Sequence, residues 1–176
     1  MLMFDQLYAT REKTMEPKFE LLEGFCATGK GIRTTNENGA SARDQGALWA
    51  NLMQTGVLSP ILAATGEETV WGIYSRFEKD HTRPFDFALA ARTPIGYPTI
   101  ESGETIEIPG GDYAVFRLTG ASPEEASVRV WETIWAWSAA NPLRRAYGID
   151  LERWSLGELM RGGPVSVMVY ISVRPR

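Results

Sequence analysis

Histidine and cysteine are the scarcest reactive side chains of this 176-residue chain, which has one of each, His81 and Cys26. A single cysteine forms no disulfide within the chain, which fits a reducing compartment, and we expect a cytoplasmic protein. The same counts exclude a zinc site built from clustered cysteine and histidine ligands. A hydrolytic triad would depend on His81, which lies in the polar stretch of residues 79–84 and is expected on a surface loop. We expect no metal and no other cofactor.

Positive charge and long apolar runs are also lacking. Lysine and arginine number 18 against 22 aspartates and glutamates, and this net charge of −4 argues against direct nucleic-acid binding. No run of about 20 apolar residues predicts a membrane-spanning helix, so we expect no membrane partner. Residues 1–15 carry four charges and no apolar core, which excludes a secretory signal. We expect these residues as an N-terminal appendage, either a short docked helix or a frayed end, ahead of one domain over residues 16–176.

Aromatic residues, in contrast, are plentiful, with six tryptophans, six tyrosines and seven phenylalanines. The hydrophobic fraction of 44% and the charged fraction of 23% are ordinary for a globular domain. Large aromatic side chains fill cores, and they also line pockets for flat apolar or cationic ligands. Core packing must account for most of them, and the question is whether some remain for a binding site.

The order of the predicted elements repeats within the chain. Strand patterns near residues 19–31, 69–77 and 85–92 surround a helix over residues 41–55. A second set follows, with strands over 105–108, 113–118, 147–154 and 165–173 and a helix over 123–139, which Ser122, Pro123 and Glu125 mark as a capped start. We predict an α+β fold of two β-α-β-β repeats, over residues 17–96 and 101–175, in an antiparallel sheet with two main helices. The runs WGI at 71–73 and YGI at 147–149, 76 residues apart, suggest pseudo-two-fold symmetry with a ligand cleft at the junction.

One run of residues matches the first part of a phosphate-binding motif, but its surroundings do not fit such a site. Residues 24–30 fit G-x-x-x-x-G-K, but Gly31 stands where a serine or threonine should bind magnesium. The surrounding residues have strand character and no helix follows, so we reject a nucleotide site.

The second helix is apolar over more than one stripe. Trp131 and Trp135 share one face, and Trp137 lies on a neighbouring face with Val130 and Ile134. All three tryptophans could be core or interface residues, and a dimer could bury them. The functional alternative places Trp131 and Trp135 on a cleft wall.

Glu152 is the strongest single candidate for a binding residue. It lies in a strand-like run and shares a face with Trp154, with Leu151 and Arg153 on the other face. A buried carboxylate needs a partner or becomes protonated. That partner is either a neighbouring arginine (144, 145 or 153) or a cationic ligand, to which aromatic walls would add cation–π attraction.

Five runs carry a resemblance to a known family: ALW at 47–49, VWGIYSRFEKD at 70–80, IPGGDYAVF at 108–116, WETIWAW at 131–137 and RAYGIDLERW at 145–154. Over roughly residues 17–175 the chain resembles the GyrI-like, AraC-type effector-binding family, and in detail its stand-alone, integron-associated branch. The resemblance implies two β-α-β-β repeats whose cleft binds hydrophobic, often cationic, drug-like molecules. An acidic residue of the family's Asp-Phe-Glu-x-Tyr-like run faces the ligand, and it maps onto Glu152. The family's Tyr-x-x-Tyr run becomes Tyr74 to Phe77, which loses one hydroxyl.

The leading prediction is therefore a multidrug-type binding module without catalysis, related to the effector domains of transcription activators. Glu152 would be the counter-charge, and the walls would be aromatic: Trp71, Tyr113, Trp131, Trp135, Trp154 and Tyr170. A regulatory role would need a separate DNA-binding protein or simple sequestration of the ligand. Two alternatives stay open. Some relatives hydrolyse cyclopropane-containing genotoxins, and others are protein-binding modules, such as a gyrase inhibitor or the effector half of a split regulator.

Overall fold

The computed structural model describes residues 15–175, and the predicted appendage of residues 1–15 therefore lies outside the described residues except for Met15. Within this part of the chain no single helix is long and apolar enough to cross a membrane. The helical segments Glu37–Thr55 and Ser59–Thr65 reach the required length and hydropathy only as a pair, with a bend of 69° between them.

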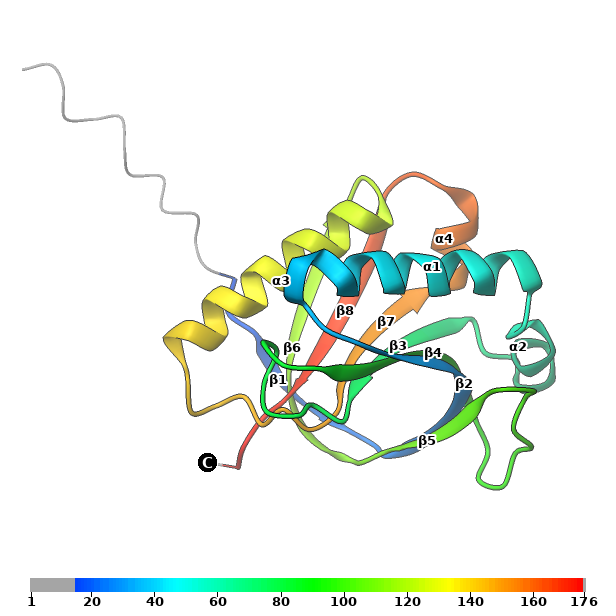
Figure 1. Ribbon diagram of the computed structural model, residues 1–176, viewed down its shortest axis with the longest axis horizontal. Helices are drawn as coiled ribbons and strands as arrows, with labels where there is room; N and C mark the ends of the chain where they lie inside the picture. The colour runs from blue at the N-terminus through cyan, green and yellow to red at the C-terminus, as the bar shows by residue number, and fades with distance from the viewer. Residues whose placement is uncertain (1–14, 176) are drawn as a thin grey trace, which may run out of the picture.

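Eight antiparallel strands form one curled sheet (Figure 1). Their order across the sheet is β1-β6-β8-β7-β3-β4-β2-β5. In chain order the strands are β1 (Lys18–Leu22), β2 (Phe25–Thr34), β3 (Thr69–Ser75), β4 (Phe85–Thr93), β5 (Glu104–Ile108), β6 (Gly111–Gly120), β7 (Asp150–Ser155) and β8 (Val165–Ser172). The G-x-x-x-x-G-K run continues into β2 and is extended, so it cannot cradle a phosphate as a loop at a helix N-terminus would.

Two long helices cover the same face of the sheet (Figure 1). A short 3₁₀ turn (Glu37–Gly39) leads into α1 (Ala40–Thr55), which ends at Gly56 in the left-handed conformation. α3 (Pro123–Ala140) begins as the sequence predicts: the Ser122 hydroxyl accepts a hydrogen bond from the Glu125 amide at 3.2 Å, and the Glu125 carboxylate accepts one from the Ala121 amide at 2.8 Å.

Two shorter helices were not predicted from the sequence. α2 (Ser59–Thr65) follows α1 directly, and α4 (Leu156–Arg161) lies between β7 and β8. Both carried a local signal, because a proline lies in the first turn of α2 and the Ser155 hydroxyl accepts from the Glu158 amide at the start of α4.

The fold confirms two β-α-β-β units, β2-α1-β3-β4 and β6-α3-β7-β8, which meet where β3 pairs with β7. The edge strands are exchanged between them: β1 pairs with β6 of the second unit, and β5 pairs with β2 of the first. The predicted repeat match at an offset of 76 residues is wrong. Tyr147 and Gly148 precede β7 instead of lying in it, and β4 and β8 begin 80 residues apart, at Phe85 and Val165.

Each face of the sheet has its own core. On the helix face, α3 packs on β6, β7 and β8, and α1 and α2 pack on β3 and β4. On the inner face of the curled sheet, alternate residues of the same strands form a third cluster, which includes Trp71, Tyr113, Leu151 and Tyr170. The two faces are separated by the backbone of the sheet, and this division decides which residues can share a site.

Candidate functional site

A groove runs between α1 and α3, over the β3–β7 junction of the two repeats. Its larger hollow has a volume of about 540 Å³, within the range of small-molecule sites. Its walls come from α1 (Gln45, Trp49, Met53) and α3 (Ser127, Val128), and its floor includes Glu152 and Trp154. A smaller adjoining hollow, of about 200 Å³, shares Gln45, Ser127 and Val128 and extends toward His81 and Arg145.

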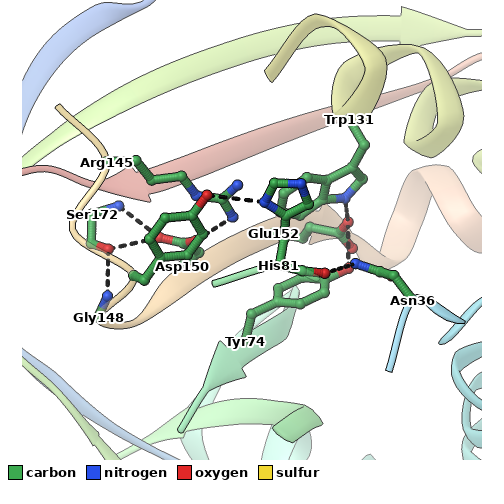
Figure 2. A network of polar contacts seen from close by, with 10 residues as sticks. Asn36, Tyr74, His81, Trp131, Arg145, Gly148, Asp150, Glu152 and Ser172 are labelled. Atoms are coloured by element: carbon green, nitrogen blue, oxygen red, sulfur yellow. Dashed lines mark hydrogen bonds and ion pairs between the residues drawn. The ribbon is translucent and has the colours of Figure 1, made fainter. Parts of the chain in front are cut away.

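Glu152 lies at the centre of this groove's floor. It is 2% exposed and directly opposite Gly72 of β3. Three neutral donors surround its carboxylate: the Trp131 indole N–H at 2.5 Å and the Tyr74 hydroxyl at 3.0 Å from Oε1, and the Trp154 indole N–H at 2.9 Å from Oε2 (Figure 2 shows the first two).

The charge of Glu152 has no cationic partner within residues 15–175. Of the three arginines considered from the sequence, Arg145 pairs with Asp150, Arg153 is exposed on the other face of β7, and Arg144 lies over the ring of Phe19. Burial raises the pKa of Glu152, while the bonds from Trp131, Trp154 and Tyr74 act in the opposite direction. The site therefore holds a buried carboxyl group that has three hydrogen-bond donors and no ion-pair partner among the described residues.

Tyr74 connects this carboxylate to α1. Its hydroxyl lies 3.0 Å from Glu152 Oε1 and 3.0 Å from Gln45 Oε1, and its one proton can be donated to only one of them at a time. Burial, followed by the nearby charge of Glu152, raises the pKa of Tyr74 well above 10.0. Tyr74 was not among the predicted site residues, although it begins the Tyr-x-x-Tyr-like run.

Three of the predicted wall residues lie on the helix face: Trp131 and Trp154 are hydrogen-bonded to Glu152, and Trp135 lines the smaller hollow. The Trp131 and Trp135 rings lie 6.4 Å apart, and Trp135 is 42% exposed at the groove's rim. Trp49 of α1, which was not predicted, meets Trp154 edge-on at 6.2 Å. Whether these rings contact a ligand stays a prediction, but the fold places them together.

The remaining three predicted wall residues do not reach this groove. Trp71, Tyr113 and Tyr170 pack together on the inner face of the sheet, with Tyr170 6.0 Å from Trp71 and 6.2 Å from Tyr113. Gly72 shares the face of Glu152 because directly opposed residues of an antiparallel pair point the same way. Its neighbour Trp71 must then point to the other face, and the prediction of one common cleft is wrong for these three residues.

The polar loop of residues 76–84 places His81 against two aromatic rings beside the groove. His81 stacks between Trp135 (6.4 Å) and Tyr147 (6.1 Å), and its Nδ1 lies 2.9 Å from the Tyr147 hydroxyl. Burial, and then the charge of Arg145, lower the pKa of His81 below 6.5. Apart from the Tyr147 hydroxyl, no hydroxyl, thiol or carboxylate is hydrogen-bonded to this imidazole in the part of the chain described. The structure also brings together no cluster of three or more metal-ligating side chains within residues 15–175.

Comparisons with known proteins agree with this architecture. The sequence profile of the family described as integron-associated effector binding protein matches residues 18–173, which include every strand and helix above. VCH_CASS2, an integron cassette protein from the mobile metagenome of Vibrio cholerae, is 26% identical with a TM-score of 0.71, over 90% of this chain and 96% of that one. SAV2435, solved bound to tetraphenylphosphonium, is 15% identical with a TM-score of 0.74, over 91% of this chain and 94% of that one.

One further relative was found by sequence similarity. YobU of Bacillus subtilis (strain 168), named for a proposed role as a transcriptional regulator, is 28% identical over 93 residues, or 52% of this chain. The match spans 57% of YobU, so this chain covers less than two thirds of that relative's length.

Proposed function

Because this chain belongs to the family of integron-associated effector binding proteins, we propose that it binds hydrophobic monocations in the groove between α1 and α3. Glu152 is the counter-charge, and Trp49, Trp131 and Trp154 are the apolar walls. The family is described by effector binding and YobU is named for regulation, and binding without turnover is the function proposed here.

The observation that carries this proposal is that the buried Glu152 has no cationic partner among the described residues. A buried carboxylate is costly unless its charge is compensated, and three neutral donors compensate it only in part. A monocation in the hollow would supply the missing charge, and it would do so in a poorly hydrated site where the attraction is stronger than in water. Rings beside the same position add cation–π attraction.

SAV2435 supports the class of ligand. That protein has the same fold and was solved with tetraphenylphosphonium, a large apolar monocation. We extend this to the present chain as a proposal, together with a regulatory role in which the ligand-loaded protein acts on a separate DNA-binding protein.

The test uses two ions of nearly equal size and opposite charge. Tryptophan fluorescence is titrated with tetraphenylphosphonium and with tetraphenylborate, on wild type and on Glu152→Gln. We expect wild type to prefer the cation and Glu152→Gln to lose about tenfold or more of the affinity for it. Glu101→Gln, at an exposed carboxylate in the turn before β5, is the matched control and should behave as wild type. Equal affinity of wild type for both ions would show that Glu152 is not a counter-charge.

A further inference from the structure

Arg145 is the least satisfied buried side chain beside the groove. It is 2% exposed, and its Nη2 donates to Asp150 Oδ2 at 2.9 Å. Within the described residues, Nε and Nη1 of the same guanidinium have no hydrogen-bond partner. Arg145 is also a lining residue of the smaller hollow, next to the larger one that holds Glu152. These two donors are buried beside a hollow and packed against the Tyr147 ring, so a ligand oxygen that displaces part of this packing would supply the missing acceptor.

The charge of Arg145 is already matched. Asp150 Oδ2 accepts from Arg145, and Asp150 Oδ1 accepts from the amide and the hydroxyl of Ser172, both at 2.8 Å (Figure 2). The pair is therefore neutral as a whole, and Glu152, when ionised, adds a negative charge. An anionic group would be repelled here, whereas a neutral oxygen can accept from the free N–H groups without a charge penalty.

The surroundings of Arg145 are flat and aromatic. Its guanidinium carbon lies 4.4 Å from the ring centroid of Tyr147, 5.8 Å from Trp131 and 6.0 Å from Phe77. His81, whose lowered pKa leaves it neutral at pH 7, stacks on Tyr147 at the same hollow. Among the described residues that line the smaller hollow, Arg145 carries the single positive charge.

Trp131 connects the two hollows. Its indole N–H donates to Glu152, and its ring faces the guanidinium of Arg145, which Figure 2 shows directed toward it. The two hollows also share Ala42, Gln45, Ser127 and Val128. The two hollows therefore adjoin, and a single ligand can extend from one into the other.

We propose that the smaller hollow is a second subsite, in which Arg145 donates a hydrogen bond to a neutral oxygen of the ligand whose cationic part lies at Glu152. This inference rests on the proposed function and narrows the ligand class. The preferred ligand is a hydrophobic monocation that also carries a ketone, ester or amide carbonyl on an aromatic group.

Two phosphonium ions that differ by one carbonyl test this subsite. (4-Benzoylphenyl)triphenylphosphonium carries a ketone on an aromatic group, and (4-benzylphenyl)triphenylphosphonium has a methylene in its place. Neither ion has a hydrogen on a carbon bound to phosphorus, so both remain monocations at every pH used. We expect wild type to bind the ketone about tenfold more tightly, as for a hydrogen bond from a charged donor. In Arg145→Lys, which keeps a cation for Asp150, the two affinities should become equal. In Glu152→Gln both should fall by the same factor.

A second measurement uses the wild-type protein alone, so it does not require that any variant folds. The ¹⁵N–Hε resonance of Arg145 in wild type should shift to lower field when the benzoyl ion is added, and should shift much less with the benzyl ion. Equal wild-type affinities for the two ions, or a ketone preference that persists in Arg145→Lys, would overturn the second subsite and leave the proposed function intact. Failure of both ions to bind wild type would overturn the proposed function and this inference with it.

Discussion

Gly72 and Glu152 are directly opposed on β3 and β7, and a β-carbon on Gly72 would lie 3.2 Å from Glu152 Oε2. The same β-carbon would also lie 3.2 Å from a ring carbon of Phe87. Because Gly72 has no side chain, the Glu152 side chain can occupy the space beside it. The position requires a small residue because of packing, not because of its backbone conformation.

Gly72→Ala should move Glu152 away from at least one of its donors. We expect a loss of stability of about 1–3 kcal/mol from overpacking, and at least a fivefold loss of affinity for tetraphenylphosphonium. Thermal unfolding and fluorescence titration measure the two effects. Gly157→Ala, in α4 and with nothing closer than 3.8 Å to the new carbon, is the control and should leave affinity unchanged. A Gly72→Ala protein with wild-type affinity would show that the position of Glu152 does not matter.

The stability of the protein should depend on pH through Glu152. Because burial raises its pKa above 4.5, the folded chain binds this proton more tightly than the unfolded chain. The contribution of Glu152 is therefore fully present below pH 4.5 and is lost as pH rises through the folded pKa. Glu152→Gln, which does not titrate, should gain stability relative to wild type as the pH rises above 4.5. Urea unfolding at several pH values measures the difference, and a difference that is constant with pH would contradict a raised pKa.

Affinity for a monocation should show the opposite trend in wild type. The ligand requires the ionised carboxylate, so binding to the protonated site must release a proton, and affinity should rise with pH above 4.5 until the folded pKa is passed. Calorimetry in two buffers of different ionisation enthalpy counts the released protons. Tyr74 does not interfere, since its pKa is raised well above 10.0. His81→Gln separates the titration of the neighbouring imidazole, and Glu152→Gln should bind independently of pH.

Two buried tryptophans on adjacent strands should respond differently to the same substitution. Trp154→Phe removes a donor to Glu152 and part of the groove's floor, so affinity for tetraphenylphosphonium should fall about tenfold. Trp71→Phe changes only the inner face of the sheet, where the indole nitrogen has no hydrogen-bond partner in the described structure. It should lower the melting temperature while affinity stays within about twofold of wild type. A larger loss of affinity in Trp71→Phe would place the ligand on the inner face.

Local patterns were sufficient to predict much of this molecule. The start of α3 follows from Pro123 in its first turn and from Ser122 and Glu125, whose side chains accept the capping bonds expected of them. The shared face of Glu152 and Trp154 follows from the period of a strand, and the structure joins them by a hydrogen bond. These features depend on neighbours a few residues apart, and for such distances spacing alone is informative.

The predictions that were wrong concern features that depend on how the strands pair. Trp71, Tyr113 and Tyr170 were assigned to the groove by their residue type, but their face is set by which residues of β3, β6 and β8 lie opposite one another. The partner of Glu152 was also left open, between a cationic ligand and an arginine at 144, 145 or 153. Only the register of β7 against β8 and the contact with Ser172 assign Arg145 to Asp150.

The exchanged edge strands make the two repeats a single cooperative unit. β1 and β5 each hydrogen-bond to the repeat that does not contain them in sequence, so a break within residues 94–103 would leave each fragment with a strand whose sheet partner belongs to the other fragment. If one repeat unfolds, the other repeat loses the edge strand that pairs with it, β1 on β6 or β5 on β2. A ligand held at the β3–β7 junction should accordingly slow amide hydrogen exchange as far away as β1 and β5, at the two outer borders of the sheet.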